Sequence, residues 1–145
     1  MRPTTPDANP PVEVGSTFTV ERSFSVEDVT EFVRISGDSG RQHIRPDPQG
    51  RLMVHGLLVA TLPTQVGGAW HFLAREITYE FLRPVWTGEV VRCVVTLTAL
   101  EPGNRGLYLR STFECVNPAG EVVMKGTARG LVPGAPPSPG GPGQG

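Results

Sequence analysis

The stretch from Gly56 to Val66 constrains the fold more than any other part of the sequence, because it is apolar on nearly every side. Its apolar residues are Leu57, Leu58, Val59, Ala60, Leu62 and Val66. A helix without a polar face must be surrounded by protein. Pro63 removes one backbone hydrogen bond, so we expect a kink or an early end there. The sequence therefore predicts a buried central helix over residues 56–66.

The segments around this helix have the alternation of β-strands. Five of them do so: 17–24, 77–81, 91–99, 107–115 and 122–132. A second helix follows the first of these strands, since Ser25 and Asp28 can form a capping box and Gly37 is suited to end the helix. Four consecutive strands joined by short turns can curl around one apolar helix. We therefore expect an α+β fold, an antiparallel sheet wrapped around a central buried helix.

Small residues are concentrated on one face of the last predicted strand. Gly126, Ala128 and Gly130 share that face. Without large side chains there, the sheet could approach a helix closely. We therefore expect this face to lie against the central helix.

The composition fits one folded domain of ordinary charge. The chain has 145 residues and a formal net charge of −1, so nothing favours nucleic acid or an anionic membrane as a partner. No apolar run approaches the roughly 20 residues needed to span a bilayer. Cys93 and Cys115 each fall in a strand-like run, which favours reduced core residues over a disulfide. The cytoplasm is the expected compartment.

Proline, glycine and small polar residues dominate both ends of the chain. Such segments bury too little apolar surface to offset the entropy of ordering them. We expect residues 1–12 and 133–145 to be disordered and residues 13–132 to form the domain. The polar N-terminus does not have the character of a signal peptide.

The segment from Gly37 to Val54 is polar, predicted to be irregular, and contains Asp38 and His43. A carboxylate and an imidazole that reach one water molecule could hold it and remove a proton from it. Asp after Gly is also a common turn residue, and a single loop histidine is usually a surface residue. On these residues alone, both interpretations stay open.

The start of the predicted central helix offers a second feature, at Gly56. The first backbone N–H groups of a helix lack partners within the helix and lie at the positive end of its dipole. They could stabilise negative charge on a carbonyl oxygen, and a glycine lets a ligand approach the backbone. The alternative is that Gly56 only permits tight packing. No Cys or His cluster has metal-ligand spacing, so no metal is expected.

These two features together resemble the signature of the MaoC-like (R)-specific enoyl-CoA hydratases. In that family an S-G-D-x-N-P-x-H loop precedes an H-G-[ML]-L helix, and here Ser36-Gly37-Asp38…His43 precedes His55-Gly56-Leu57-Leu58. The resemblance extends from about Phe18 to Leu131. Two departures stand out, since Gly40-Arg41 replaces the Asn-Pro that helps to fix the loop and its water, and Arg45 replaces an acid.

The resemblance implies a hot-dog fold and a set of site residues. Asp38 and His43 would be the catalytic pair, activating a water that adds to C3 of a trans-2-enoyl thioester and returning a proton to C2. The Gly56 N–H would bind the thioester carbonyl. Possible supporting residues of the site are Ser36, Gly37, His55 and Leu57.

The resemblance also implies the partners of the chain. The acyl chain of the substrate would run between the central helix and the sheet. The protein would form a homodimer, act on a thioester of coenzyme A or acyl carrier protein, and use no metal or redox cofactor. Dehydration of 3-hydroxyacyl thioesters would be the reverse reaction.

Two other functions remain as alternatives. Many hot-dog thioesterases place a carboxylate on the central helix, but residues 56–66 contain no Asp or Glu. A non-catalytic acyl-binding subunit of a dehydratase is the second alternative, which the loss of Asn-Pro favours and the retention of Asp38 and His43 opposes. His71, after the central helix, is a minor candidate for lining the acyl pocket.

Overall fold

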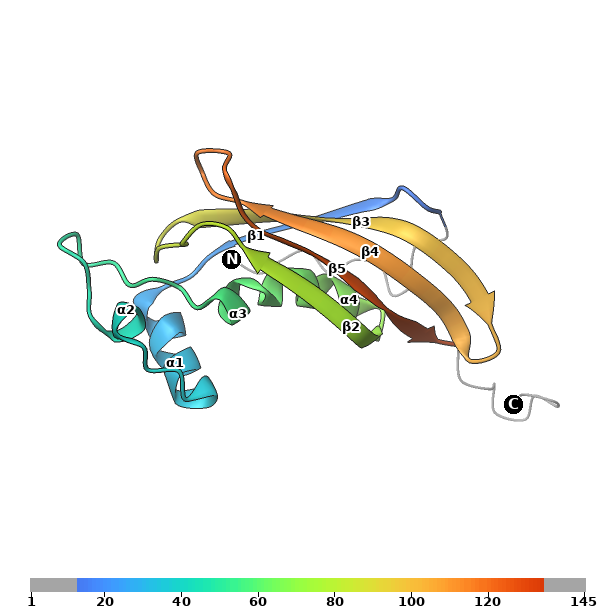
Figure 1. The fold of residues 1–145 in the computed structure, drawn as a ribbon, viewed down its shortest axis with the longest axis horizontal. Coiled ribbons are helices and arrows are strands. Elements are labelled where there is room, and N and C mark those ends of the chain that lie inside the picture. The colour runs from blue at the N-terminus through green and yellow to red at the C-terminus, as the bar shows by residue number, and fades with distance from the viewer. Residues whose placement is uncertain (1–12, 135–145) are drawn as a thin grey trace.

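The computed structural model describes residues 13–134, and a single curved sheet forms most of it (Figure 1). Its strands are β1 Thr17–Ser23, β2 Leu73–Phe81, β3 Val90–Gly103, β4 Gly106–Val116 and β5 Val122–Pro133. They lie in the order β1-β3-β4-β5-β2, and every neighbouring pair is antiparallel. The segments predicted to be disordered, 1–12 and most of 133–145, lie outside the described residues. Pro133 belongs to β5, one residue beyond the expected boundary.

The helices lie on one side of the sheet and at one end of it. Figure 1 shows α3 (Gly56–Val59) and α4 (Thr61–Ala69) beneath the sheet, while α1 (Val26–Ser36) and α2 (Arg41–Ile44) lie together at its end. The predicted α+β arrangement, an antiparallel sheet around a central helical segment, is therefore confirmed. Within residues 13–134, no helix combines the length and the apolar character needed to cross a bilayer.

Local sequence fixes both ends of α1, and this matters because the loop at its C-terminus carries Asp38. The Asp28 N–H donates to Ser25 Oγ at 3.0 Å, and the Ser25 N–H donates to Asp28 Oδ2 at 2.9 Å. That second bond lowers the pKa of Asp28 from its ordinary value. Gly37 has φ 77° and donates its N–H to the Val33 carbonyl, so it ends the helix as predicted.

The central helical segment is broken, and the break comes earlier than its proline. The chain forms α3 and α4 with Ala60 between them, instead of one helix over residues 56–66. Pro63 has no N–H to donate, and a proline ring clashes with the carbonyl four residues before it, here that of Val59. The helix therefore ends at Val59 and restarts at Thr61, which puts Pro63 in a first turn, where proline is tolerated.

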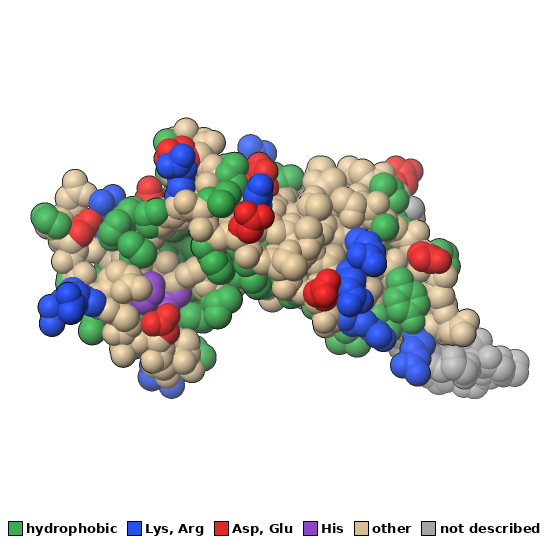
Figure 2. Space-filling model, in the orientation of Figure 1, with side chains coloured by type: hydrophobic (Ala, Val, Ile, Leu, Met, Phe, Trp, Pro, Cys, Tyr) green, Lys and Arg blue, Asp and Glu red, His purple; other side chains and the backbone are tan. Residues whose placement is uncertain are grey.

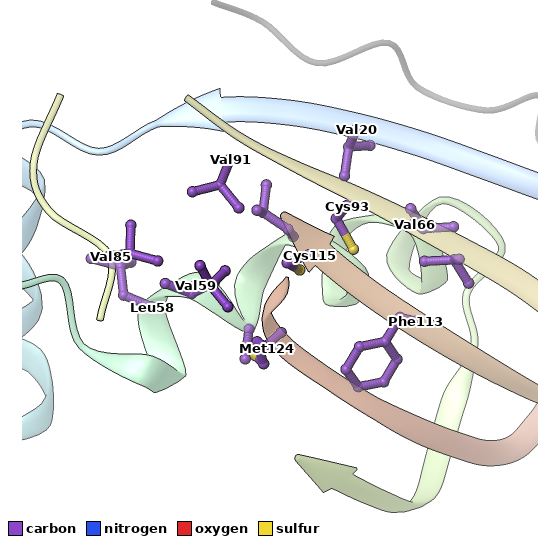
Figure 3. Packing of buried hydrophobic residues seen from close by; sticks show 14 of the residues in the cluster. Val20, Leu58, Val59, Val66, Val85, Val91, Cys93, Phe113, Cys115 and Met124 are labelled. Carbon is purple, nitrogen blue, oxygen red and sulfur yellow. The ribbon is translucent and has the colours of Figure 1, made fainter. Parts of the chain in front are cut away.

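The helical segments bury apolar side chains against the concave face of the sheet (Figure 3). Val59 and Val66 face the strand residues Val91 and Cys115 across this core, and Leu57 is an exception at 58% exposure. The expectation that the whole segment is enclosed is therefore wrong at Leu57. Cys93 and Cys115 are fully buried and free, as expected of reduced core residues.

The small residues of β5 make room for aromatic rings rather than for a helix. A Cβ at Gly126 would overlap the Phe113 ring, and a Cβ at Gly130 would overlap the Phe72 ring. The close contacts of α4 with the sheet are to β1 and β3. The expected close approach of β5 to the central helix is therefore wrong, because two aromatic side chains occupy that space.

Candidate active site

The end of α1 presents Asp38 through a short chain of hydrogen bonds. The Ser36 hydroxyl donates to the Phe32 carbonyl at 2.6 Å and accepts the Asp38 N–H at 3.0 Å. The Asp38 carboxylate accepts the Gly40 N–H at 3.1 Å. Its side chain is 57% exposed. Ser36 therefore holds the backbone of Asp38, and the Asp38 carboxylate remains open to solvent.

His43 lies in α2, a single helical turn within the segment predicted to be irregular. That prediction is wrong over Arg41–Ile44. The His43 side chain is 6% exposed, and its Nδ1 lies 2.7 Å from the Met53 carbonyl oxygen. A carbonyl can only accept, so Nδ1 of the neutral ring carries the proton and Nε2 presents a lone pair. A neutral imidazole in this tautomer can act as a base through Nε2.

His55 also contacts the segment that carries Asp38 and His43. Its Nε2 lies 3.0 Å from the Asp38 carbonyl oxygen, to which it donates. The His43 and His55 rings stack with centroids 3.6 Å apart and an interplanar angle of 14°. His55 is 2% exposed, and its Nδ1 is buried without a hydrogen-bond partner among the described residues. His55 therefore contacts both residues of the predicted pair.

The Asp38 carboxylate and the His43 ring approach each other. Asp38 Oδ2 lies 3.7 Å from His43 Nε2. This separation is too long for a direct hydrogen bond and suits one bridging water. Both side chains can therefore contact the same small molecule.

A cavity of about 610 Å³ opens in front of these groups. It lies between α1, α2, the start of α3 and the end of β2, and Figure 2 shows histidine atoms recessed in the surface at this end of the molecule. Its lining includes Ser36, Asp38, Gln42, His43, His55, Gly56, Leu57 and Phe81. The predicted site residues thus line one cavity, except Gly37, the C-terminal cap of α1, which is not part of the lining.

Gly56 lies at the floor of this cavity as the first residue of α3. Neither the Gly56 N–H nor the Leu57 N–H donates to a protein acceptor among the described residues. A Cβ at position 56 would overlap the Phe81 ring, so the glycine is needed for this packing as well. Both predicted roles of Gly56 are therefore compatible with its surroundings. The contact with Phe81, an exposed aromatic residue of β2, had no signal in the sequence.

A second, smaller cavity of about 150 Å³ lies between α4 and the sheet. Its lining is largely apolar and includes Val66, Trp70, Phe72, Phe113 and Ala128, with Thr64, Tyr79 and Ser111 as hydroxyl-bearing residues. An apolar chain buried there would meet mostly apolar side chains, although the Trp70 indole nitrogen is buried without a hydrogen-bond partner among the described residues. His71, the minor sequence candidate, lines neither cavity.

The donor types of the site also match those of a metal centre. Atoms of Asp38, His43 and His55 lie within 4.8 Å of one another, a grouping that sequence spacing did not reveal. However, the two imidazole rings are stacked and nearly parallel, so their in-plane lone pairs lie in separate planes. An ion about 2.0–2.1 Å from both nitrogens would lie out of the plane of each ring. The arrangement suits proton transfer better than ligation.

Comparisons with known proteins agree with this architecture. No protein-family model matches the chain. The chain is 26% identical over 132 residues to an (R)-specific enoyl-CoA hydratase of Rhodospirillum rubrum, an alignment that covers 84% of this chain and 89% of that protein.

The structural comparisons show the fold. An (R)-hydratase from A. caviae involved in PHA biosynthesis superposes with a TM-score of 0.75 at 24% identity, covering 84% of this chain and 98% of that one. An R-hydratase from Pseudomonas aeruginosa gives 0.74 at 22% identity, covering 86% and 84%. A 3R-hydroxyacyl-ACP dehydratase complex from Mycobacterium tuberculosis gives 0.67 at 14% identity, covering 81% and 96%.

An antiparallel sheet around a central helix, with these neighbours, defines a hot-dog protein. Within that fold class, the chain is similar in sequence to an (R)-specific enoyl-CoA hydratase and in fold to (R)-hydratases and a MaoC-like dehydratase.

Proposed function

We propose that this protein catalyses the reversible hydration of trans-2-enoyl thioesters to (R)-3-hydroxyacyl thioesters. The observation that carries the proposal is the placement of Asp38 Oδ2 and His43 Nε2, 3.7 Å apart on one cavity, with a lone pair rather than a proton on Nε2. The similarity to an (R)-specific enoyl-CoA hydratase supports it. The expected compartment is the cytoplasm, and the carrier is coenzyme A or acyl carrier protein.

In the proposed reaction, a water bridges Asp38 and His43. As its oxygen bonds to C3 of the substrate, one of its protons passes to this pair, and a proton returns from the pair to C2. Negative charge develops on the thioester oxygen between these events. The unpartnered N–H of Gly56 is a donor that would stabilise this charge. The acyl chain would extend toward the apolar cavity between α4 and the sheet.

A two-channel assay tests this proposal on the purified protein. With crotonyl-CoA as substrate, we expect the enoyl absorbance to fall while free thiol stays constant. Loss of the thioester with release of thiol would instead establish a thioesterase, the alternative that the absence of Asp and Glu from residues 56–66 disfavours. No change in either signal would contradict catalysis and favour a non-catalytic subunit.

We also propose that two copies of the chain join through β2. This strand pairs with β5 on one side only and is therefore an edge strand in the described sheet. Leu73, Ile77 and Phe81 on β2 are 58%, 38% and 53% exposed. Open edges with exposed apolar side chains favour pairing with another chain, and a second copy offers a self-complementary surface.

A charge placed on this edge should separate the two copies. We expect the unmodified protein to have the mass of a dimer in light scattering, and Ile77→Lys to have the mass of a monomer. Val90→Lys, an equally drastic change at an exposed apolar residue outside β2, is the matched control and should remain dimeric. A monomeric unmodified protein, or a dimeric Ile77→Lys variant, would contradict the proposed interface.

A further inference from the structure

The side chain of Gln42 occupies an unexpected position in the site. Its amide nitrogen lies 3.3 Å from His43 Nε2, the same atom that Asp38 Oδ2 approaches to 3.7 Å. Since Nδ1 of the neutral His43 ring donates to Met53, Nε2 can only accept, and the amide N–H of Gln42 is the donor. Three side chains therefore surround the place where the attacking water would lie.

Gly40 makes room for this side chain. A Cβ at position 40 would lie 3.0–3.2 Å from the amide atoms of Gln42, tighter than ordinary contact. The family motif has asparagine at position 40, whose side chain would crowd the observed position of Gln42. Gly40 and Gln42 therefore form one arrangement. In it, the side-chain amide that reaches the water belongs to residue 42 instead of residue 40.

We propose that Gln42 is a positioning residue that replaces the asparagine of the family motif and orients the attacking water. When water enters, the Gln42 N–H donates to its oxygen, and the water donates its two protons toward His43 Nε2 and Asp38. One lone pair of the water then remains to form the bond to C3. This inference rests on the proposed hydratase function, and it adds a residue that the motif does not contain.

Gln42→Met tests the proposal, because methionine has a similar length and no N–H. We expect kcat for crotonyl-CoA hydration to fall about five- to tenfold, with little change in KM, since the amide acts on water rather than on the thioester. Gln42 is exposed, so the melting temperature should not change. Gln49→Met, at an exposed glutamine of the next turn, is the matched control and should keep the full rate.

Restoring the family motif provides a second readout that a merely structural role would not give. Gly40 has φ −52° and ψ 144°, a conformation open to asparagine and suited to a residue before proline. Arg41 is the first residue of α2, where proline is favoured. We therefore expect Gly40→Asn with Arg41→Pro to recover kcat in the Gln42→Met background.

The outcomes separate this inference from the function on which it rests. An unmodified protein without hydratase activity would overturn both. An active protein whose Gln42→Met variant retains its kcat, or loses activity together with thermal stability, would overturn the role of Gln42 alone. A kcat loss that the Asn–Pro pair does not recover would overturn the equivalence of the two arrangements.

Discussion

Asp38→Asn and His43→Ala should each lower kcat for enoyl-thioester hydration by a factor of about 10²–10⁴, the usual contribution of positioned acid–base groups. Asparagine keeps the shape of the Asp38 side chain but cannot take a proton, and alanine removes the lone pair of Nε2. Asp38 is more than half exposed, so its replacement should leave the fold unchanged. Steady-state rates with crotonyl-CoA and the melting temperature are the two measurements.

The variant that combines Asp38→Asn with His43→Ala tests whether the two side chains act on the same water. If both side chains act on one water, removing the second should cost little more than removing the first, because groups that act as a unit are strongly non-additive. His71→Asn is the control, since His71 has φ 57°, a conformation that asparagine tolerates, and lines neither cavity. A single variant with the unmodified rate, or losses that simply multiply, would contradict the shared-water geometry.

Gly126→Ala should destabilise the protein by about 1–3 kcal/mol, the usual cost of overpacking a well-filled interior. The added Cβ would overlap the Thr78 carbonyl oxygen of β2 and the Phe113 ring. Neither group can yield easily, because one is sheet backbone and the other is 3% exposed. Chemical denaturation measures the difference in unfolding free energy directly.

The matched control is Gly68→Ala in α4. A Cβ at Gly68 meets nothing within 4 Å, and alanine is a better helix former than glycine. This variant should be as stable as the unmodified protein or more so. If Gly126→Ala unfolded at the same denaturant concentration as Gly68→Ala, the close contact between β2 and β5 would be wrong.

The sequence predicted the elements whose patterns are local. The capping box of Ser25 and Asp28, the end of α1 at Gly37, and the alternation along β3 and β4 each depend on neighbouring residues, and the structure has them. The central helical segment was also predictable, because a helix that is apolar on nearly every side must be buried. The expected kink or end at Pro63 missed the position of the break, which lies at Ala60 because the proline ring clashes with the Val59 carbonyl four residues earlier.

The features missed in the site depend on contacts between distant residues. A single turn such as α2 has little stability of its own, and here the His43–Met53 hydrogen bond joins residues ten positions apart. The stacking of His43 on His55 and the packing of Phe81 on Gly56 are likewise tertiary. The loop motif predicted that Asp38 and His43 lie close together, but what surrounds them depends on the tertiary fold.

The two cysteines have a practical consequence for the thiol assay. Cys93 and Cys115 face each other across β3 and β4 with no exposed surface, and their mutual hydrogen bond together with burial raises the pKa of Cys93 well above its usual range. Thiol reagents react with the thiolate form, so Cys93 and Cys115 should not react with them while the chain is folded. Any thiol detected during turnover then comes from the carrier of the substrate. A slow signal without substrate would show that the sheet had unfolded locally and exposed the cysteines.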